Sequence, residues 1–245
     1  MKHICIFLAF KNVEHIKLSF DSMSHDDVDF FIVENHSENS DEIYEYFKNK
    51  KLVGYIKFNE NIAANAINIF IKNHRDLLLE YDYITMTDGD LFVYDIKETI
   101  NEIRNALDRN ICSIASSSLY MGNWYSIRND NRLIGIEYYN DYMKNTIKSF
   151  GCVEGSTSGY LMTIRKKDLH LFENIHFIDS NILDRINNMG LAWYKTNKNL
   201  VYHLTWDLYV EGNEYFEWKK QVYPQIWDLL GDDFKYENKL INYVL

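Results

Sequence analysis

Proline and glycine are scarce in this chain. Its 245 residues include one proline, Pro224, and 10 glycines, and no low-complexity stretch or internal repeat interrupts them. Flexible linkers between domains are usually rich in glycine, serine or proline. Their scarcity excludes an obvious linker and favours one compact domain, which a chain of this length can form.

Cysteine is also scarce. The three cysteines, Cys5, Cys112 and Cys152, have no paired spacing, and the first two stand in apolar runs. Small buried side chains are therefore favoured over a thiol nucleophile or a metal site. This cysteine usage is typical of a protein of the reducing cytoplasm.

Long apolar runs are absent. No stretch approaches the roughly 18 uninterrupted apolar residues of a membrane span, so we expect no transmembrane segment. The apolar run at residues 4–10 is not followed by an A-x-A-like cleavage site, which favours a first β-strand over a signal peptide. We expect a cytoplasmic protein, and peripheral attachment at the inner face of a membrane stays open.

Positive charge is in deficit. The chain has 26 Lys and Arg against 36 Asp and Glu, a net charge of -10. A nucleic-acid-binding surface needs the opposite balance, so we expect no nucleic-acid partner. A nucleotide ligand remains compatible, because a bound cation and a few local basic groups can offset its phosphates.

Strand-like and helix-like segments alternate in the first half of the chain. The hydrophobic pattern predicts strands at 4–9, 29–34, 55–58 and 83–87, and helices at 13–23, 41–50 and 62–79. Strands separated by helices predict a parallel sheet. Ligands of such sheets bind at the carboxyl ends of strands, where Glu34-Asn35 and Asp88-Gly89-Asp90 both fall.

The second half has a less regular pattern. It predicts strands at 111–116, 160–164 and 200–203, a turn at 155–159 and a helix at 181–189. Residues 124–136 favour a loop or hairpin, and 138–148 fit a strand or a helix equally well. Apolar residues after Gly212 recur at helical spacing and predict a helical cap over the core.

The triplet Asp88-Gly89-Asp90 is the strongest candidate site. About two D-x-D triplets are expected by chance in such a composition, and two occur, the other being Asp27-Val28-Asp29. Only Asp88-Gly89-Asp90 follows a strand directly and precedes another apolar run. Paired carboxylates there suit a divalent cation and the phosphates it carries; the alternative is a solvated turn.

An ordered set of segments resembles the GT-A fold nucleotide-sugar glycosyltransferases, most like the glycosyltransferase family 2 group. The matching segments span about residues 3 to 207: 31–37, 59–68, 83–90, 155–162, 177–185, Gly190 and 201–203. The chain departs from the family pattern at Ile62, where glycine is usual, and at Ile178 and Asn181, where acidic residues are usual.

The resemblance implies an α/β, GT-A (Rossmann-like) fold with a mostly parallel central sheet flanked by helices and a C-terminal helical cap. It implies one catalytic domain over 1–212. Its nucleotide-binding half covers about 1–95 and its acceptor-side half about 96–212. Residues 213–245 would form a helical extension packed on that domain.

The resemblance also implies a metal site and a donor site. Asp90, Asp88 and His203 would hold Mn²⁺ or Mg²⁺ against the donor diphosphate, although His203 could instead be a structural strand-end histidine. The donor would contact six residues: Glu34, Asn35, Asn61, Asn65, Asp88 and Gly89. For the glutamate and asparagines, turn and helix-start roles are the alternatives.

On the acceptor side, the resemblance makes Asp179 the general base that removes the proton of an attacking hydroxyl. Asp184 and Glu154 compete for that role, and Asp179 could instead cap a helix. Ser158, Gly159 and Trp206 would line the acceptor side, with Trp124 and Trp193 as further stacking candidates.

The implied function is a metal-dependent, inverting hexosyltransferase. A nucleotide-sugar, by default a UDP-sugar, would be the donor, and a glycan or lipid-linked glycan of a bacterial surface polysaccharide the acceptor. The alternatives are a sugar nucleotidyltransferase and a non-catalytic carbohydrate- or nucleotide-binding module. Residues 10–13, which contain no glycine, count against the nucleotidyltransferase. The oligomeric state stays open.

Overall fold

The computed structural model describes residues 1–63, 65–119, 160–173, 175, 179–204, 212–214, 217, 218, 220, 221 and 236–241. For 118, 119, 160, 179, 180, 197–200 and 236–241 it describes the backbone alone. Among all these residues, no helix combines the length and the apolar character needed to span a membrane.

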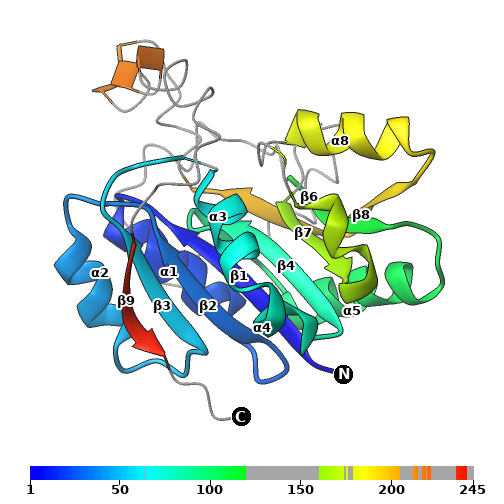
Figure 1. Cartoon of the computed structure of the whole chain (residues 1–245), viewed down its shortest axis with the longest axis horizontal. Coiled ribbons are helices and arrows are strands. Elements are labelled where there is room, and N and C mark those ends of the chain that lie inside the picture. Colours follow the sequence, from blue (N-terminus) through cyan, green and yellow to red (C-terminus); the bar gives the residue numbers. More distant parts are fainter. Residues whose placement is uncertain are drawn as a thin grey trace.

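A nine-stranded sheet forms the centre of the described part of the chain (Figure 1). The strands are β1 (His3–Ala9), β2 (Asp29–Glu34), β3 (Gly54–Phe58), β4 (Tyr83–Asp88), β5 (Leu91–Val93), β6 (Ile114–Leu119), β7 (Tyr160–Arg165), β8 (Trp193–His203) and β9 (Tyr236–Ile241). Their order is β5-β8-β6-β7-β4-β1-β2-β3-β9.

Most strands run in one direction. The parallel pairs β1–β2, β1–β4, β2–β3 and β6–β8 and the antiparallel contacts of β7 give β1, β2, β3, β4, β6 and β8 a common direction. Strands β5, β7 and β9 run the opposite way. The predicted mostly parallel sheet is confirmed.

Helices cover both faces of this sheet. One apolar cluster joins it to α1 (Val13–Met23), α2 (Ser40–Phe47) and α5 (Ile96–Asp108). The other joins it to α3 (Asn65–Asn73), α4 (Arg75–Leu79), the 3-10 helix η1 (Lys166–Leu171) and α8 (Asp179–Asn188). Alternation along β1 explains this arrangement, because Cys5 and Phe7 face the first cluster and Ile4 and Ile6 the second.

Several elements differ from the sequence-based expectations. The helix predicted at 62–79 is divided at His74 into α3 and α4. Helix α5 was not predicted, although Asp95 caps it by accepting a hydrogen bond from the Glu98 N–H at 2.9 Å. The tail is not helical throughout: 236–241 form β9, which pairs antiparallel with β3 at the edge of the sheet.

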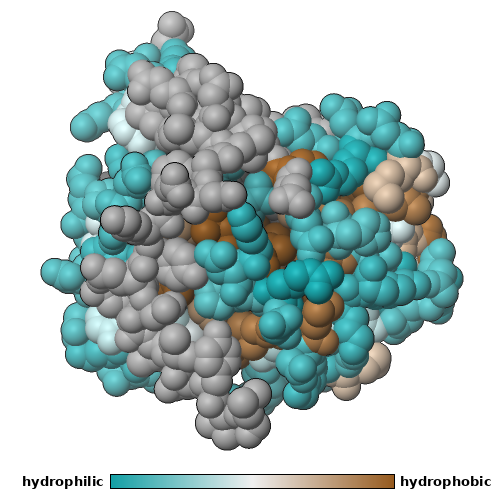
Figure 2. Space-filling view, viewed as in Figure 1, coloured by the Kyte–Doolittle hydropathy of each residue, from teal (hydrophilic) through white to brown (hydrophobic). Residues whose placement is uncertain are grey.

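The described surface is mostly hydrophilic in the view of Figure 2, and Cys5 and Cys112 are buried as predicted. Figure 2 shows hydrophilic residues over most of the described surface in that view, with apolar residues gathered near its centre. Cys5 and Cys112 are free and buried, and burial raises the pKa of both thiols. Cys152 lies outside the described residues.

Candidate functional site

The register of the parallel strands brings the predicted acidic residues to one edge of the sheet. Leu8 of β1 lies opposite Asp88 of β4, and Ala9 lies opposite Glu34 of β2. Asp88 and Glu34 therefore stand at the carboxyl ends of the two strands that flank β1. This is the edge at which parallel α/β sheets bind their ligands.

The turn after β4 requires a glycine. The Gly89 N–H donates to the Leu8 carbonyl oxygen at 2.8 Å. A Cβ atom at position 89 would lie 2.8 Å from that same oxygen and 2.9 Å from the Phe7 ring. The close approach to β1 thus explains why glycine stands between the two aspartates. It also fixes the backbone position from which Asp90 follows.

Strand β8 brings His203 to Asp90. The antiparallel pairing of β5 with β8 sets Leu91 opposite His203, and the Leu204 N–H donates to the Asp90 carbonyl oxygen at 2.7 Å. As a result, His203 Nε2 lies 3.7 Å from Asp90 Oδ2. His203 is buried, Asp90 is partly buried, and Asp88 is exposed.

Helix α1 holds the other side of β5. The Leu91 N–H donates to Ser19 Oγ at 3.2 Å, and the Val93 N–H donates to Ser22 Oγ at 3.0 Å. Both serines are buried on α1. These two bonds satisfy amides that the short strand would otherwise leave without sheet partners, and they anchor the segment that follows Asp90.

Asp90 and His203 offer oxygen and nitrogen atoms that suit a divalent cation whose other ligands come from a bound molecule. Within the described part of the chain, no group of three or more His, Cys, Asp and Glu residues is placed to hold a metal ion. Asp90 and His203 do lie together, and Asp88 is two residues from Asp90. Mg²⁺ and similar cations commonly take one or two protein ligands and complete their shell with phosphate oxygens and water.

Glu34 is fully buried, and both of its carboxylate oxygens have partners. Oε1 accepts a hydrogen bond from the Ser37 N–H at 2.6 Å, and Oε2 accepts one from the Ser40 hydroxyl at 2.7 Å. Burial, and next the nearby Glu34 carboxylate, raise the pKa of Tyr55. These contacts agree with the alternative in which Glu34 is a turn residue. They hold the loop between β2 and α2 in place.

Asn35 and Asn61 hold the loop after β3. Asn35 is buried; its Oδ1 accepts from the Ile62 N–H at 3.0 Å, and its amide donates to Asn61 Oδ1 at 2.8 Å. Asn61 Oδ1 also accepts from the Ala63 N–H at 2.9 Å. Asn65 is buried at the first residue of α3. Asn35 and Asn61 thus hold the backbone of the loop beside the carboxyl edge.

An aromatic stack at this edge was not predicted. The ring of Phe10, directly after β1, stacks on Trp218 with centroids 5.4 Å apart and planes inclined by 27°. Lys11 Nζ lies 4.2 Å from the centre of the Trp218 ring. Lys11 has a positive φ of 61°, and its N–H donates to Ser37 Oγ at 2.9 Å.

The acceptor side is described only in part. Asp179 is the first residue of α8, but its side chain is outside the description, as are Ser158, Gly159, Trp206, Trp124 and Glu154. Arg185 Nη1 donates to the carbonyl oxygens of Leu171 and Glu173 at 3.1 and 2.6 Å, which ties α8 to the end of η1. Trp193 Nε1 donates to Ser116 Oγ at 2.8 Å, within the sheet.

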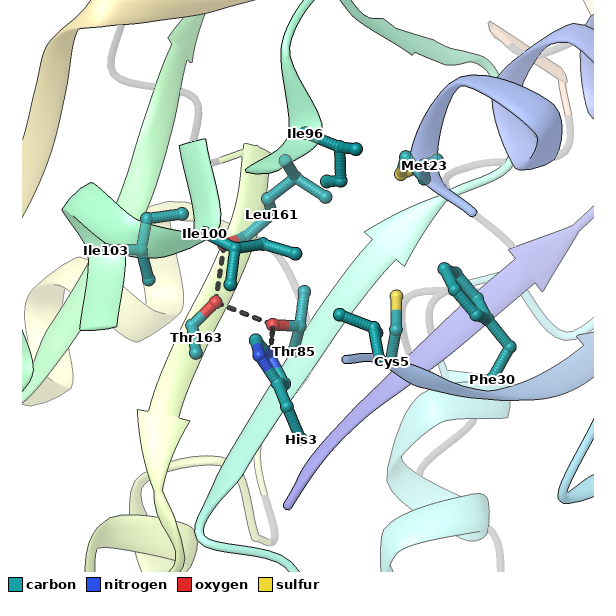
Figure 3. Close-up of a pocket in the computed structure, with 11 residues that line it drawn as sticks. His3, Cys5, Met23, Phe30, Thr85, Ile96, Ile100, Ile103, Leu161 and Thr163 are labelled. Atoms are coloured by element: carbon teal, nitrogen blue, oxygen red, sulfur yellow. Dashed lines mark hydrogen bonds between the residues drawn. The ribbon is translucent and has the colours of Figure 1, made fainter. Parts of the chain in front are cut away.

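A small cavity lies away from the carboxyl edge, between the sheet and α5 (Figure 3). It is lined mainly by apolar side chains and has room for about one water molecule. On its wall, His3 Nε2 and Thr85 Oγ1 are 2.6 Å apart, and Thr85 Oγ1 and Thr163 Oγ1 are 2.7 Å apart. Burial, and then Arg104, lower the pKa of His3 to about 3. This cavity is too small for a nucleotide.

Comparison by sequence finds viral relatives. No family model matches the chain. It is 30% identical over 243 residues to the uncharacterized protein L142 of Acanthamoeba polyphaga mimivirus, covering 91% of this chain and 48% of that protein. It is 30% identical over 238 residues to protein L138 of the same virus, covering 91% of this chain and 26% of that protein. The chain spans about half or less of the curated relatives it matches.

Comparison by structure finds more distant proteins. The mannosyltransferase PcManGT from Pyrobaculum calidifontis, in complex with GDP-Man and Mn²⁺, has a TM-score of 0.57 at 11% identity, over 89% of this chain and 60% of that one. S. aureus TarS 1-349, in complex with UDP-GlcNAc, has a TM-score of 0.51 at 14% identity, over 95% and 68%. At such identities the likeness establishes a shared fold.

Proposed function

We propose that this chain, which has the GT-A fold of nucleotide-sugar transferases, is a metal-dependent glycosyltransferase. It would move a sugar from a nucleotide-sugar donor to a hydroxyl group of an acceptor. The observation that carries the proposal is the turn Asp88-Gly89-Asp90, held at the carboxyl edge with Asp90 3.7 Å from His203. The GDP-Man and UDP-GlcNAc complexes of the two structural neighbours support this donor class.

Asp90 and His203 would hold Mn²⁺ or Mg²⁺ against the donor diphosphate, and Asp88 would contact the cation or the ribose. Such a cation, when bound, neutralises the negative charge that develops on the leaving diphosphate. The turn at Gly89 keeps Asp90 beside β8. The two side chains therefore need little reorganisation to bind a ligand, which favours binding.

The remaining donor contacts would come from residues at or after the carboxyl ends of β2, β3 and β4. Glu34, Asn35, Asn61, Asn65 and Gly89 make up this proposed set. Because Glu34 and Asn35 already hold their own loops through hydrogen bonds, we propose that they act mainly by fixing backbone positions around the nucleotide. A UDP-sugar is the default donor.

On the acceptor side, Asp179 would remove the proton from the attacking hydroxyl, so that attack opposite the diphosphate inverts the anomeric centre. Ser158, Gly159 and Trp206 would line the acceptor. We propose a glycan or lipid-linked glycan as acceptor. The viral relatives give no support to a bacterial pathway, and a cytoplasmic or membrane-peripheral location stays a prediction.

A thermal-shift panel of nucleotide sugars, with and without Mn²⁺, tests this proposal. A ligand at 100 times its Kd stabilises the folded state by about 2.7 kcal/mol, which raises the Tm of a domain of this size by roughly 5–10 °C. We expect such a shift with one donor and Mn²⁺, and its loss in Asp90→Asn. Asp26→Asn, at an exposed carboxylate before β2, is the matched control.

A second variant separates binding from chemistry. Asp179→Asn should keep the donor-induced thermal shift and lose sugar transfer, because the amide cannot accept the proton of the acceptor. No shift with any nucleotide sugar would refute the donor class. A normal Mn²⁺-dependent shift in Asp90→Asn would refute the metal site.

A further inference from the structure

The stack of Trp218 on Phe10 lies within the candidate donor site. Phe10 follows Ala9, whose carbonyl oxygen accepts from the Asn35 N–H at 3.0 Å. One residue before Ala9, the carbonyl oxygen of Leu8 accepts from the Gly89 N–H. Phe10 is therefore placed between the exits of β2 and β4, where the proposed donor would bind.

A short helical segment carries Trp218 to this position from the far end of the chain. Residues 214, 217, 218, 220 and 221 are helical, and Figure 1 draws this segment in orange at the top of the view, above the sheet. The Glu217 N–H donates to the Asn213 carbonyl oxygen at 2.9 Å, and Glu217 Oε1 accepts from the Gly212 N–H at 3.2 Å. Gly212 has a positive φ of 83° at the start of the turn.

The two rings leave no space for a third one. Stacked aromatic faces need a separation of about 3.5 Å on each side of an inserted ring, so a sandwiched nucleobase would need the outer rings roughly 7 Å apart. The observed centroid separation is 5.4 Å. A base that stacks on the covered face of Phe10 must first displace Trp218.

The chemistry around Phe10 suits a nucleotide. An aromatic face stacks on a nucleobase of any identity, and Lys11 beside it supplies a positive charge for the ribose phosphate. In the present structure Trp218 makes the two contacts that a nucleotide would make. It stacks on Phe10, and the centre of its ring lies 4.2 Å from Lys11 Nζ. An indole and a nucleobase are similar in size and in their flat aromatic faces.

We propose that Trp218 is an internal competitor of the donor nucleobase, which lowers donor affinity by occupying the Phe10 face until the nucleotide displaces it. The proposal rests on the function proposed above and adds regulation of the same site. An aromatic pair of this kind favours the closed state by about 2- to 10-fold. The apparent donor affinity falls by a similar factor, because only the open fraction binds.

The test measures the affinity of UDP and GDP, each with Mn²⁺, by isothermal titration calorimetry. Trp218→Ala should bind the preferred nucleotide about 2- to 10-fold more tightly than the wild type, and Trp218→Phe should lie between them. Glu214→Ala, an exposed change on the same segment, should bind as the wild type does. Thermal unfolding of every variant verifies its fold.

Intrinsic fluorescence gives a second readout. Nucleotide should shift the emission of the wild type to longer wavelength as Trp218 leaves Phe10, and this shift should be missing in Trp218→Ala. Equal affinity in the wild type and both Trp218 variants overturns the competitor. Weaker binding in Trp218→Ala also overturns it, because Trp218 would then be a wall of the site. Absence of binding to every variant overturns the proposed function as well.

Discussion

Gly89 is the position at which a single methyl group should disturb the candidate site most directly. Gly89→Ala places a Cβ 2.8 Å from the Leu8 carbonyl oxygen and 2.9 Å from the Phe7 ring. Real Cβ atoms essentially never approach heavy atoms that closely. Leu8 pairs with strands on both sides, and Phe7 is fully buried, so neither neighbour can move without disturbing the sheet.

The expected cost follows from overpacking. Extra methyl or methylene groups in a packed region cost about 1–3 kcal/mol. For a domain of this size, each kcal/mol lowers Tm by about 2–4 °C, so Gly89→Ala should melt roughly 2–12 °C below the wild type. The turn must also shift outwards, which moves Asp90 away from His203 and should weaken Mn²⁺-dependent donor binding.

Gly190 offers a matched control, because it needs glycine for a different reason. It has a φ of +65°, and a Cβ added there would have no heavy atom within 4 Å, so the cost of a substitution is one of backbone conformation. Asparagine tolerates the left-handed region, so Gly190→Asn should be less destabilising than Gly190→Ala. At position 89 the order should reverse, because asparagine is the larger side chain.

Thermal unfolding by circular dichroism and titration of GDP or UDP with Mn²⁺ measure both effects. A Gly89→Ala variant that melts within a degree of the wild type would show that the close approach to β1 does not restrict the turn. Tighter or unchanged Mn²⁺-dependent binding in a destabilised Gly89→Ala would separate the turn from the proposed metal site.

Two further predictions concern buried polar groups. The pKa of His3 is lowered from 6.5 to about 3, so the unfolded chain binds a proton that the folded chain does not. The stability that the chain has with His3 neutral and buried is fully present above pH 6.5. It is lost as the pH falls towards 3, at up to about 1.4 kcal/mol per pH unit. Urea unfolding at pH 7, 6 and 5 should show that slope and a flatter one in His3→Gln; equal slopes would contradict it. Asn35→Ala removes the acceptor of the buried Ile62 N–H and the donor to Asn61, and should cost about 1–3 kcal/mol in urea unfolding. The exposed Asn39→Ala should stay within about 0.5 kcal/mol of the wild type, and similar values for both variants would reject the bracing role of Asn35.

Local patterns predicted much of the fold. Apolar alternation and helical spacing in the first half place β1, β2, β3 and β4 close to their observed bounds. Their order with intervening helices gave a parallel sheet whose carboxyl edge gathers Glu34 and Asp88. These features depend on which side chains are buried, and burial leaves a period in the sequence itself.

Other elements left weaker signals. Strand β5 has three residues, too few to show a period, and it depends on hydroxyl groups of α1 for its amides. Strand β9 follows a segment with helical spacing, and its pairing with β3 at the sheet edge is a long-range contact. Sequence patterns show local preference, whereas an edge strand is decided by the partner that is free to receive it.

Local patterns predicted the parallel core and the place of Asp88-Gly89-Asp90 after β4, and the family resemblance pointed to His203 as a partner of these aspartates. Three features became visible only in the folded chain: Leu91 pairs with His203, Glu34 accepts hydrogen bonds from Ser37 and Ser40, and Trp218 stacks on Phe10. Residues distant in sequence meet there through strand register and packing. Those depend on the free energy of the whole chain, which no local pattern encodes.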